Sequence, residues 1–455
     1  MITRGRLIHD LRAAGVTTGR RIFVHSSLRS LGKVKGGADT VIDALMSALG
    51  PRGTLIMPTF TYSLVHWSST PFDPSQSPSQ TGQITDSFWR RSDVRRTHHP
   101  THSCGVWGLH ADEVAEGHRD AVGEESPLGW LLRRGGLTVQ IGTDHVTNTA
   151  LHLCEELARL PYLEVAFTPG QSHEIAHRVM GDGRIEEVRV EPVPGSSKGF
   201  SRVEPLLAEA GIVQRVRVGE AETLVTSLPA LVGVVVPALQ RHPGLLLSLH
   251  PDDESCQARR ARLHRDTAVQ GRDLIDLFIE GFPRGGSLRW SEREVVEDGA
   301  QRLAEQALDR LGSGDWSLEA LKSHLRDSGV SVDLRGTDAM QFSLCEPREK
   351  RITIWRGALA RLSRAMGETT VPCGRPLRRL IEADLADLAL AHEGFHLLMP
   401  TTASSLQGRI IEEVAARLFA DRLLSLPVPS LLVDVWLMHW AGAGAMHAPP
   451  PPPDV

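Results

Sequence analysis

The chain has 455 residues, of which 41% are hydrophobic, and its 50 basic and 55 acidic side chains leave a net charge of −5. This length exceeds what one ordinary hydrophobic core organises, so we expect two or three domains. The near balance of charge gives no electrostatic footprint for nucleic acid or for an anionic membrane, which favours a small molecule or a peptide as substrate. The sequence does not indicate an oligomeric state.

The sequence contains little that would indicate export, membrane insertion or disulfide bonding. No segment reaches the roughly 20 apolar residues of a membrane span, and the N-terminus lacks the apolar core of a signal peptide. We therefore expect a cytoplasmic protein. The five cysteines are scattered, odd in number and without a CxxC pair, so neither a disulfide framework nor a thiolate zinc site is indicated.

Residues 1 to about 245 alternate between strand and helix patterns. Apolar, β-rich runs at 21–28, 53–60 and 137–143 predict strands, and a helical period at 39–50 ends at Gly50. This alternation predicts an α/β domain over residues 1–270, with functional groups at strand ends and in loops.

The pattern changes to charged, amphipathic helix from Ser287, after the turn-forming run FPRGGS, which places a boundary near 270–290. We expect a helical linker region at 271–330 and a mainly helical α+β domain at 331–440, with one strand at 351–355. The tail at 441–455 is rich in proline, and we expect it to be disordered.

The stretch LAHEGFHLLMP at 390–400 carries two histidines four residues apart. On a helix they lie on one face, so His392 and His396 are able to bind one metal ion, with Glu393 beside them as a general base for water. The apolar spacing of the next helical run, 406–424, turns Glu413 toward the first helix as a third ligand. Glu412 is the alternative if the helical phase is shifted by one residue.

The segment from RITIW through LAHEGFH to EEVAARLFADRLL resembles the ImmA/IrrE-type zinc metallopeptidase family. In that family a strand precedes the HExxH helix, and a glutamate of the next helix completes the site. The resemblance covers about residues 330–430 and implies Zn²⁺ as cofactor, His392, His396 and Glu413 as its ligands, and Glu393 as the catalytic base. The alternative is a domain that keeps the fold without proteolysis.

Five stretches of the first half occur in a set order, at 25–63, 72–85, 95–108, 123–136 and 142–156. Together they resemble the aminoglycoside 3-N-acetyltransferase family over about residues 5–265. The resemblance implies the α/β fold of that family, acetyl-CoA as cosubstrate and an amine as acceptor.

Acetyl transfer from a thioester needs a base for the amine, a pocket for pantetheine and donors for the oxyanion. His152, in NTALHLCEE, is the predicted base, because an imidazole with a pKa of about 6.5 is mostly neutral at pH 7. The resemblance points to the same histidine. Glu155 is predicted to orient it, although a carboxylate at this spacing is also a common surface charge.

The serine pair that follows the expected strand at 21–28 offers hydroxyls and amides to the thioester arm of the cosubstrate. The predicted cofactor-binding residues are Ser26, Ser27, Leu28, Ser103 and Thr149. Three histidines lie in the block at 95–108, and loop packing is the simpler role for His98, His99 and His102. Of these, His102 is the best candidate to line the site.

One departure from the family concerns the acceptor. Members that modify aminoglycosides usually carry an acidic run after the base histidine, which pairs with the polycationic drug. Here the corresponding segment, 184–200, reads RIEEVRVEPVPGSSKGF, in which Glu191 retains one predicted catalytic-site carboxylate. A cationic aminosugar has fewer partners there. Acyl transfer is still predicted, whereas an antibiotic acceptor is disfavoured.

The run HPDDE at 250–254 matches the metal-binding signature of PIG-L-type sugar N-deacetylases. That signature belongs near the start of its own long α/β domain, after a first strand. Here it stands at the end of the acetyltransferase-like region and before charged helical sequence. We interpret it as a coincidental polar loop.

Together these patterns predict a bifunctional enzyme, an acetyl-CoA-dependent N-acetyltransferase fused to a zinc peptidase-like domain. One hypothesis is that the chain cleaves a precursor peptide and acetylates the new N-terminus. A second is aminoglycoside resistance with a structural appendage, and a third is a regulatory protein that senses a ligand.

Overall fold

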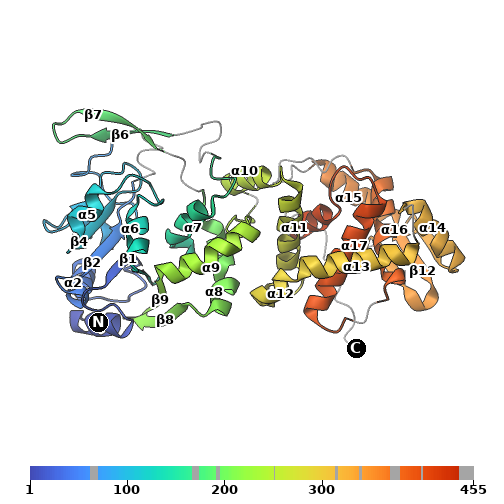
Figure 1. The fold of residues 1–455 in the computed structure, drawn as a ribbon, viewed down its shortest axis with the longest axis horizontal. Coiled ribbons are helices and arrows are strands. Elements are labelled where there is room, and N and C mark those ends of the chain that lie inside the picture. The colour runs from blue at the N-terminus through green and yellow to red at the C-terminus, as the bar shows by residue number, and fades with distance from the viewer. Residues whose placement is uncertain are drawn as a thin grey trace. The chain divides into compact units, whose positions relative to one another are not determined.

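The structure, a computed structural model, describes residues 1–61, 70–165, 174–190, 195–250, 252–312, 316–337, 341–368, 380–400 and 403–439. It divides into two compact units, Met1–Ser248 and Leu249–Val455 (Figure 1). The expected disordered tail at 441–455 lies outside the described residues. In the part of the chain that is described, no helix combines the length and apolarity needed to cross a membrane.

The first unit is built on a mixed seven-stranded sheet in the order β3-β4-β2-β1-β5-β9-β8. Its centre is parallel, with β1 between β2 and β5, and the flanking pairs are antiparallel. The expected α/β organisation is therefore present. The strands are β1 Arg21–Ser26, β2 Thr54–Pro58, β3 Arg95–Arg96, β4 Cys104–Gly108, β5 Leu137–Ile141, β8 Val213–Val218 and β9 Ala221–Ser227.

Successive side chains along a strand of the first unit pack on opposite faces of the sheet. In β1, Ile22 and Val24 enter the core that contains α1, α2 and α4, whereas Phe23 and His25 point to the opposite face. The helices α6, α7 and α9 contact one another as a second group. The helices are α1 Arg4–Ala13, α2 Gly37–Leu49, α4 Gln83–Trp89, α5 Ala111–Glu116, α6 Pro127–Arg133, η1 His145–Thr147, α7 Ala150–Ala158, η2 Ser197–Val203, α8 Glu204–Ala210 and α9 Leu228–Arg241.

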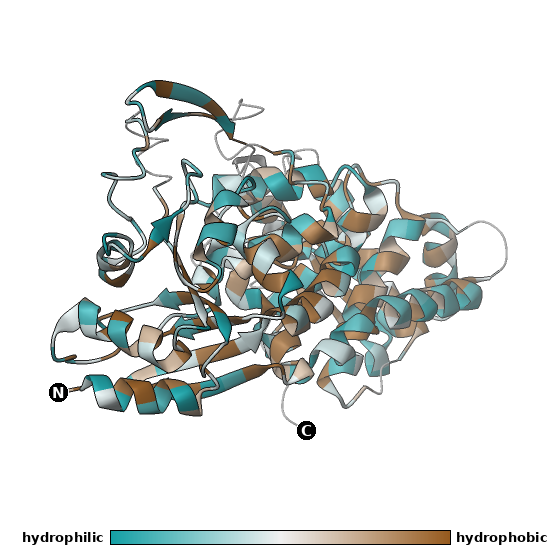
Figure 2. Ribbon diagram, turned by 60° about the vertical axis from the view of Figure 1, so that its left-hand side comes forward, coloured by the Kyte–Doolittle hydropathy of each residue, from teal (hydrophilic) through white to brown (hydrophobic). Residues whose placement is uncertain are grey.

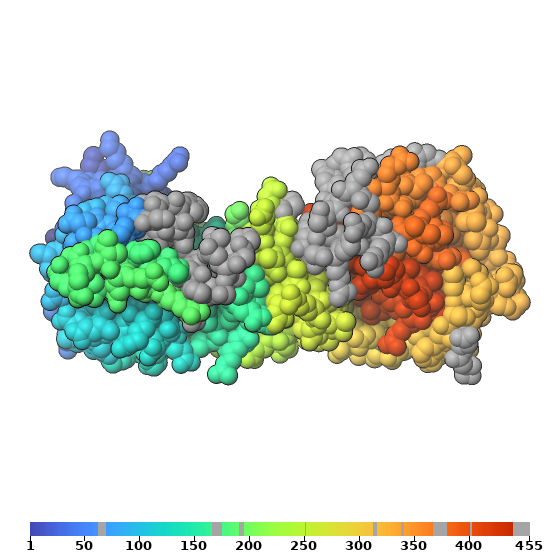
Figure 3. All heavy atoms as spheres, turned by 90° about the horizontal axis from the view of Figure 1, so that it is seen from above, coloured from blue at the N-terminus to red at the C-terminus, as the bar shows by residue number. Residues whose placement is uncertain are grey.

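A two-stranded hairpin, β6 Glu174–Val179 and β7 Ile185–Val190, stands apart from the main sheet and lies at the surface (Figure 3). Phe72 fixes it to the rest of the unit. The Phe72 amide donates to His177 O at 2.7 Å, Phe72 O accepts from Val179 N at 2.8 Å, and the buried ring packs on Ala176 and Val190.

The second unit is mainly helical around a three-stranded sheet in the order β10-β12-β11. Its helices alternate hydrophobic and hydrophilic residues (Figure 2), which is the pattern that buries one face of each. The strands are β10 Ser331–Arg335, β11 Ser343–Glu346 and β12 Arg351–Trp355. The helices are α10 Glu254–Leu263, α11 Thr267–Gly281, η3 Gly285–Ser287, α12 Trp290–Glu294, α13 Val296–Leu311, α14 Leu318–Asp327, η4 Pro347–Glu349, α15 Arg356–Glu368, α16 Glu382–Leu398, α17 Leu406–Leu423 and α18 Leu431–His439.

Two expectations about domain organisation need correction. The units divide after Ser248, ahead of the expected boundary near 270, and the region 271–330 is no linker, because α11, α13 and α14 supply part of the single core around α16 and α17. The sheet also has two strands besides the expected one at 351–355. β10 and β11 are short, with mostly half-exposed or exposed side chains, so they lack the apolar run that identifies a buried strand.

The helices α17 and α18 are joined by a polar contact at the edge of the core. Arg417 donates to both carboxylate oxygens of Asp434, at 2.6 and 2.7 Å. One turn further along α17, Asp421 accepts from Ser430 N at 2.8 Å. Burial raises the pKa of the Asp421 carboxyl to about 6 and outweighs the hydrogen bonds from Ser430 and the charge of Arg417.

This raised pKa makes the stability of the second unit depend on pH. The folded state holds the Asp421 proton more tightly than the unfolded state, so between about pH 4 and pH 6 stability falls as pH rises. We expect Asp421→Asn to be more stable than the wild type at pH 7.5, by on the order of 2 kcal/mol, and nearly equal to it at pH 4. Calorimetric unfolding temperatures across this range measure the effect.

Asp434→Asn is the matched control, because it breaks the ion pair with Arg417 and is expected to lower the unfolding temperature at pH 7.5. The same pH dependence in Asp421→Asn as in the wild type would contradict the role assigned to the Asp421 carboxyl.

Candidate functional sites

The first site is at the start of α7, where a chain of hydrogen bonds fixes His152. Its Nδ1 lies 2.7 Å from Glu155 Oε2, and Glu155 Oε1 accepts from the Tyr162 hydroxyl at 2.5 Å. Glu155 is 3% exposed and the His152 side chain 12%, so the carboxylate is inside the unit and the imidazole is at its edge. The Phe200 ring meets the imidazole edge-on, with ring centroids 4.6 Å apart.

This geometry defines which nitrogen of His152 acts as the base. Because a carboxylate only accepts, the hydrogen bond at Nδ1 places the proton there and leaves the lone pair on Nε2. A buried carboxylate beside Nδ1 also stabilises the imidazolium that forms when Nε2 takes a proton. The predicted contact between Glu155 and His152 is therefore present, and their catalytic roles stay predictions.

The start of α7 is attached to the end of β1. Thr149 N donates to His25 Nε2 at 3.4 Å, and Ala150 N donates to Asn148 Oδ1 at 3.3 Å. These contacts satisfy amide groups that a helix leaves open at its N-terminus. Burial lowers the pKa of His25 to about 4, so the ring is neutral and able to accept. The Thr149 side chain, predicted to bind the cosubstrate, is largely buried at this junction.

The serine loop after β1 has the hydroxyl groups that the sequence predicts for cosubstrate binding. Ser27 N donates to Ile141 O at 2.9 Å, and Ser27 Oγ accepts from Ser30 Oγ at 2.9 Å. Among the described residues, no group hydrogen-bonds to the buried Ser26 Oγ. A hydroxyl buried without a partner is able to bind a ligand group. Leu28, by contrast, packs against the core that contains α1 and α2.

Ser103, a predicted cofactor-binding residue, has hydrogen-bond partners inside the unit, and its binding role stays a prediction. Its side chain is fully buried, Oγ donates to Thr59 O at 2.7 Å and accepts from Arg96 Nε at 3.3 Å. The antiparallel pairing of β4 with β2, which continues as Thr59 N donating to Ser103 O at 2.8 Å, brings these groups together. Ser103 therefore joins two strands inside the unit.

The histidines at 98–102 mostly follow the simpler prediction of loop packing. His102 is buried, lies 2.9 Å from Thr101 Oγ1 through Nδ1, and packs against the Phe60 ring at a centroid distance of 4.6 Å. Burial lowers the pKa of His99 to about 4. His102 therefore has packing contacts inside the unit, and its place in lining the site stays a prediction. Glu191 lies outside the described residues.

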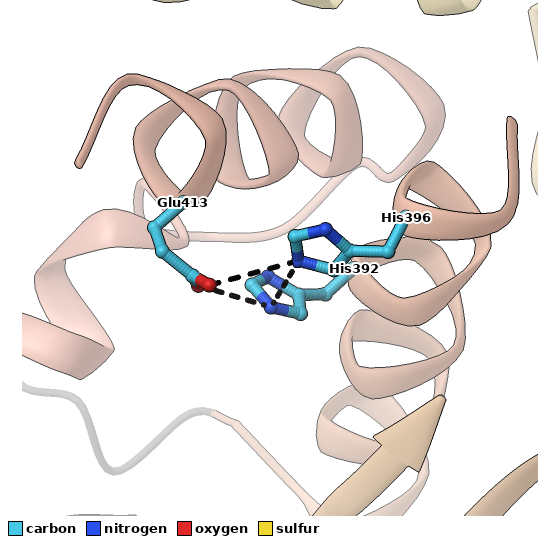
Figure 4. Close-up of side chains that lie close together, drawn as sticks. All are labelled: His392, His396 and Glu413. Carbon is cyan, nitrogen blue, oxygen red and sulfur yellow. Dashed lines mark hydrogen bonds and ion pairs between the residues drawn. The ribbon is translucent and has the colours of Figure 1, made fainter. Parts of the chain in front are cut away.

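The second site lies between α16 and α17, where the three predicted metal ligands meet (Figure 4). His392 Nε2 and His396 Nε2 are 3.3 Å apart. Glu413 approaches His392 to 3.4 Å and His396 to 3.8 Å. Within the described ranges this is the one cluster of three side chains able to hold a metal ion. Glu412, the alternative ligand, is not part of it.

The cluster fits Zn²⁺ in donor type and spacing. Two ligands about 2.0–2.1 Å from a tetrahedral zinc ion are about 3.3 Å apart, close to the nitrogen separation of His392 and His396. Burial opposes the charge on Glu413, but the contact with His392 and the nearby His396 and Arg417 outweigh it and lower the Glu413 pKa to about 2. Burial and His392 lower the pKa of His396. The donor set is therefore one carboxylate and two imidazole nitrogens.

Glu393 lies next to this cluster without belonging to it. It is 9% exposed, and its Oε1 accepts from Ser343 Oγ at 2.7 Å. Ser343 is on β11, so the sheet positions the predicted base while α16 supplies the ligands on either side of it.

In the run at 250–254, Glu254 is the first residue of α10 and the described residues before it precede the helix. Asp253 accepts from Cys256 N at 3.2 Å and caps α10, while His250 and Asp252 are 61% and 87% exposed. This agrees with its interpretation as a polar loop.

Comparison with known proteins decides the family of the first unit. The family model described as aminoglycoside 3-N-acetyltransferase matches residues 23–240. Aminoglycoside N(3)-acetyltransferase IV of Salmonella sp is 30% identical over 270 residues, which cover 57% of this chain and 95% of the relative. The chain belongs to the aminoglycoside 3-N-acetyltransferase family. It is an N-acetyltransferase, and its acetyltransferase region ends close to the boundary between the two units.

Two further proteins are also similar to this chain. The SPbeta prophage-derived aminoglycoside N(3')-acetyltransferase-like protein YokD of Bacillus subtilis is 32% identical over 185 residues, 36% of this chain and 67% of the relative. The crystal structure of the AAC(3)-IVa apoenzyme is 29% identical, with a TM-score of 0.48, and the match covers 56% of this chain and 95% of that chain. The matched family region stops at residue 240, so the metal cluster lies outside it.

Several residues that contact the predicted site residues were not identified from the sequence. Tyr162 reaches Glu155 and Phe200 reaches His152 from outside α7, and Ser343 reaches Glu393 across 50 residues. Tyr162 carried a weak signal as one of two tyrosines in the chain. Ser343 carried none, because nothing local in SLCE indicates the carboxylate that it contacts.

The cluster predicts a zinc content that depends on Glu413 and not on its neighbour. Protein loaded with Zn²⁺ and dialysed is expected to retain about one ion per chain, measured by plasma mass spectrometry. Glu413→Gln and His396→Ala are expected to weaken zinc binding at least about a hundredfold. Glu412→Gln is the matched control and should retain zinc. Equal loss in Glu412→Gln and Glu413→Gln would contradict the assigned ligand set.

Proposed function

We propose that the first unit transfers the acetyl group of acetyl-CoA to a primary amine, with His152 as general base. The observation that carries this proposal is the hydrogen-bonded chain of Tyr162, Glu155 and His152 in a member of an acetyltransferase family. Ser26 and Ser27 are proposed to contact the thioester arm of the cosubstrate through their hydroxyl groups at the end of β1.

The reaction needs one proton acceptor and one leaving group. The amine nitrogen attacks the thioester carbonyl carbon, a C–N bond forms and the C–S bond breaks. His152 Nε2 takes the proton from the nitrogen, and Glu155 stabilises the resulting imidazolium. The proton then passes to the departing thiolate of CoA, so the base returns to its neutral state.

The charges around the hairpin bear on the acceptor. The relatives' names include aminoglycosides, which are polycations, and an aminoglycoside is the first alternative acceptor for this chain. On β7, however, Glu186 is already paired with Arg178 at 2.6 Å. A carboxylate engaged by arginine attracts a cation less. An acceptor with a single amine is therefore our preferred class.

His152→Ala is expected to lower kcat by about 10²- to 10⁴-fold, because the neutral imidazole that accepts the proton is lost. Thiol release from acetyl-CoA, followed with a panel of aminoglycosides, small monoamines and peptides, measures the effect. His9→Ala is the matched control, since His9 is 80% exposed on α1, and it should keep wild-type rates. Equal rates in His152→Ala and the wild type would contradict the assignment of the base.

For the second unit we propose zinc-dependent hydrolysis of a peptide bond. The convergence of His392, His396 and Glu413 beside the buried Glu393 favours this function. Zn²⁺ held there would supply Lewis-acid polarisation of water and of the scissile carbonyl. Glu393 is placed to accept the proton of the attacking water and to pass it to the leaving amine. A unit that keeps this fold without hydrolysis is the alternative.

The two proposed activities connect through one chemical group. Cleavage of a peptide bond exposes an α-amine with a pKa of about 7.7–8.0, which is easily deprotonated and suits acetylation by a tethered domain. We propose that the chain trims a peptide and acetylates the new N-terminus.

Mass spectrometry of a peptide pool incubated with acetyl-CoA and Zn²⁺ tests this link. The wild type is expected to give cut, acetylated fragments, His152→Ala cut but unacetylated ones, and Glu393→Gln intact peptides at unchanged zinc content. If the zinc-loaded wild type left all peptides intact, the proposal of peptide processing would be wrong. Tight acetyl-CoA binding without transfer to any amine would favour a ligand-sensing protein instead.

A further inference from the structure

Tyr162 is a buried residue whose hydroxyl bonds to the residue beside the proposed base. It lies just after α7, its side chain is fully buried, and its hydroxyl donates to Glu155 Oε1 at 2.5 Å. Burying a tyrosine hydroxyl requires a partner. Here that partner is the carboxylate that contacts the proposed base.

The backbone after α7 explains how Tyr162 reaches that carboxylate. The helix ends at Ala158, and its C-cap Arg159 has a φ of 53° and a ψ of 50°, left-handed values that L-residues adopt rarely. The chain then folds back through tight turns, in which Leu163 N donates to Leu160 O at 3.1 Å and Val165 N to Tyr162 O at 3.0 Å. This reversal returns the tyrosine to the helix that it has just left.

Both oxygens of the Glu155 carboxylate are thereby occupied, Oε2 by His152 and Oε1 by Tyr162. The terminal torsion of a glutamate is soft, so a carboxylate with a single donor is free to swing. Two donors on opposite oxygens hold its plane. Since Glu155 is 3% exposed, water does not readily replace either donor.

We propose that Tyr162 is a positioning residue for acetyl transfer. By holding the Glu155 carboxylate, its hydroxyl keeps the proton of His152 on Nδ1 and the lone pair on Nε2. The inference rests on the proposed function of the first unit and deepens it, because the hydroxyl acts on the base through Glu155 and contacts neither substrate.

Tyr162→Phe tests the proposal, because it removes the hydroxyl and keeps the ring. With an acceptor that the wild type uses, we expect kcat to fall about tenfold, with the KM for acetyl-CoA unchanged within about twofold. Glu155→Gln is the reference variant. Its amide presents a donor to Nδ1, favours the opposite tautomer, and should lower kcat further.

A second measurement needs no acceptor. In full-length protein labelled with ¹⁵N-histidine, the ring nitrogen shifts of His152, assigned by their loss in His152→Gln, report which nitrogen carries the proton. The wild type should show the Nδ1–H form alone, Glu155→Gln the Nε2–H form, and Tyr162→Phe a mixture. Circular dichroism and the unfolding temperature identify a variant that has lost its fold, in which case Tyr162→Met, which also lacks a donor and adds no volume, replaces it.

The two measurements separate failure of the inference from failure of the proposed function. Wild-type kcat in a folded Tyr162→Phe variant, or an unchanged tautomer, would overturn the positioning role. A rise in KM for acetyl-CoA with kcat unchanged would also overturn it, by assigning Tyr162 to binding. If the wild type acetylates no amine, the proposed function fails, and the nitrogen shifts alone decide whether Tyr162 controls His152.

Discussion

The parallel pairing of β1 with β5 is the constraint on which the first site depends. Residues of the two strands lie in register, with His25 opposite Gln140 and Ser26 opposite Ile141. In a parallel pair the carboxyl ends of both strands reach the same edge of the sheet, so the segments that follow them meet there. One segment is the serine loop, and the other leads into α7 with His152. Antiparallel pairing would put them at opposite edges.

The second site depends on how one helix packs on another. On α16 the spacing of His392 and His396 is set by helical geometry. The third ligand comes from α17, so the two helices must pack in the register that brings Glu413 level with the histidines. The rings of Phe395 and Phe419, both fully buried, meet at a centroid distance of 5.8 Å between the same two helices. This apolar contact fixes the register that brings Glu413 opposite the histidines.

The two sites share one hydrogen-bonding arrangement despite their different chemistry. Each has a largely buried carboxylate whose orientation is set by a hydroxyl from outside its own helix. Tyr162 donates a hydrogen bond to Glu155 in the first unit, and Ser343 donates one to Glu393 in the second. A buried carboxylate without such a donor would carry an uncompensated desolvation cost and a loose geometry. Both functions proposed for the chain require a proton acceptor held in one orientation.

Local sequence determined much of this protein. The strands at 21–26, 54–58 and 137–141, the family of the first half and the pairings of His152 with Glu155 and of His392 with His396 follow from short-range patterns, because helical and strand periodicity act over a few residues. The boundary at Ser248, the burial of Ser103 and the meeting of Glu413 with the two histidines were decided by tertiary structure. So were the contacts of Tyr162 and Ser343. Each of these depends on which distant segments pack together, and no local period encodes the close packing of side chains that the chain brings together only on folding.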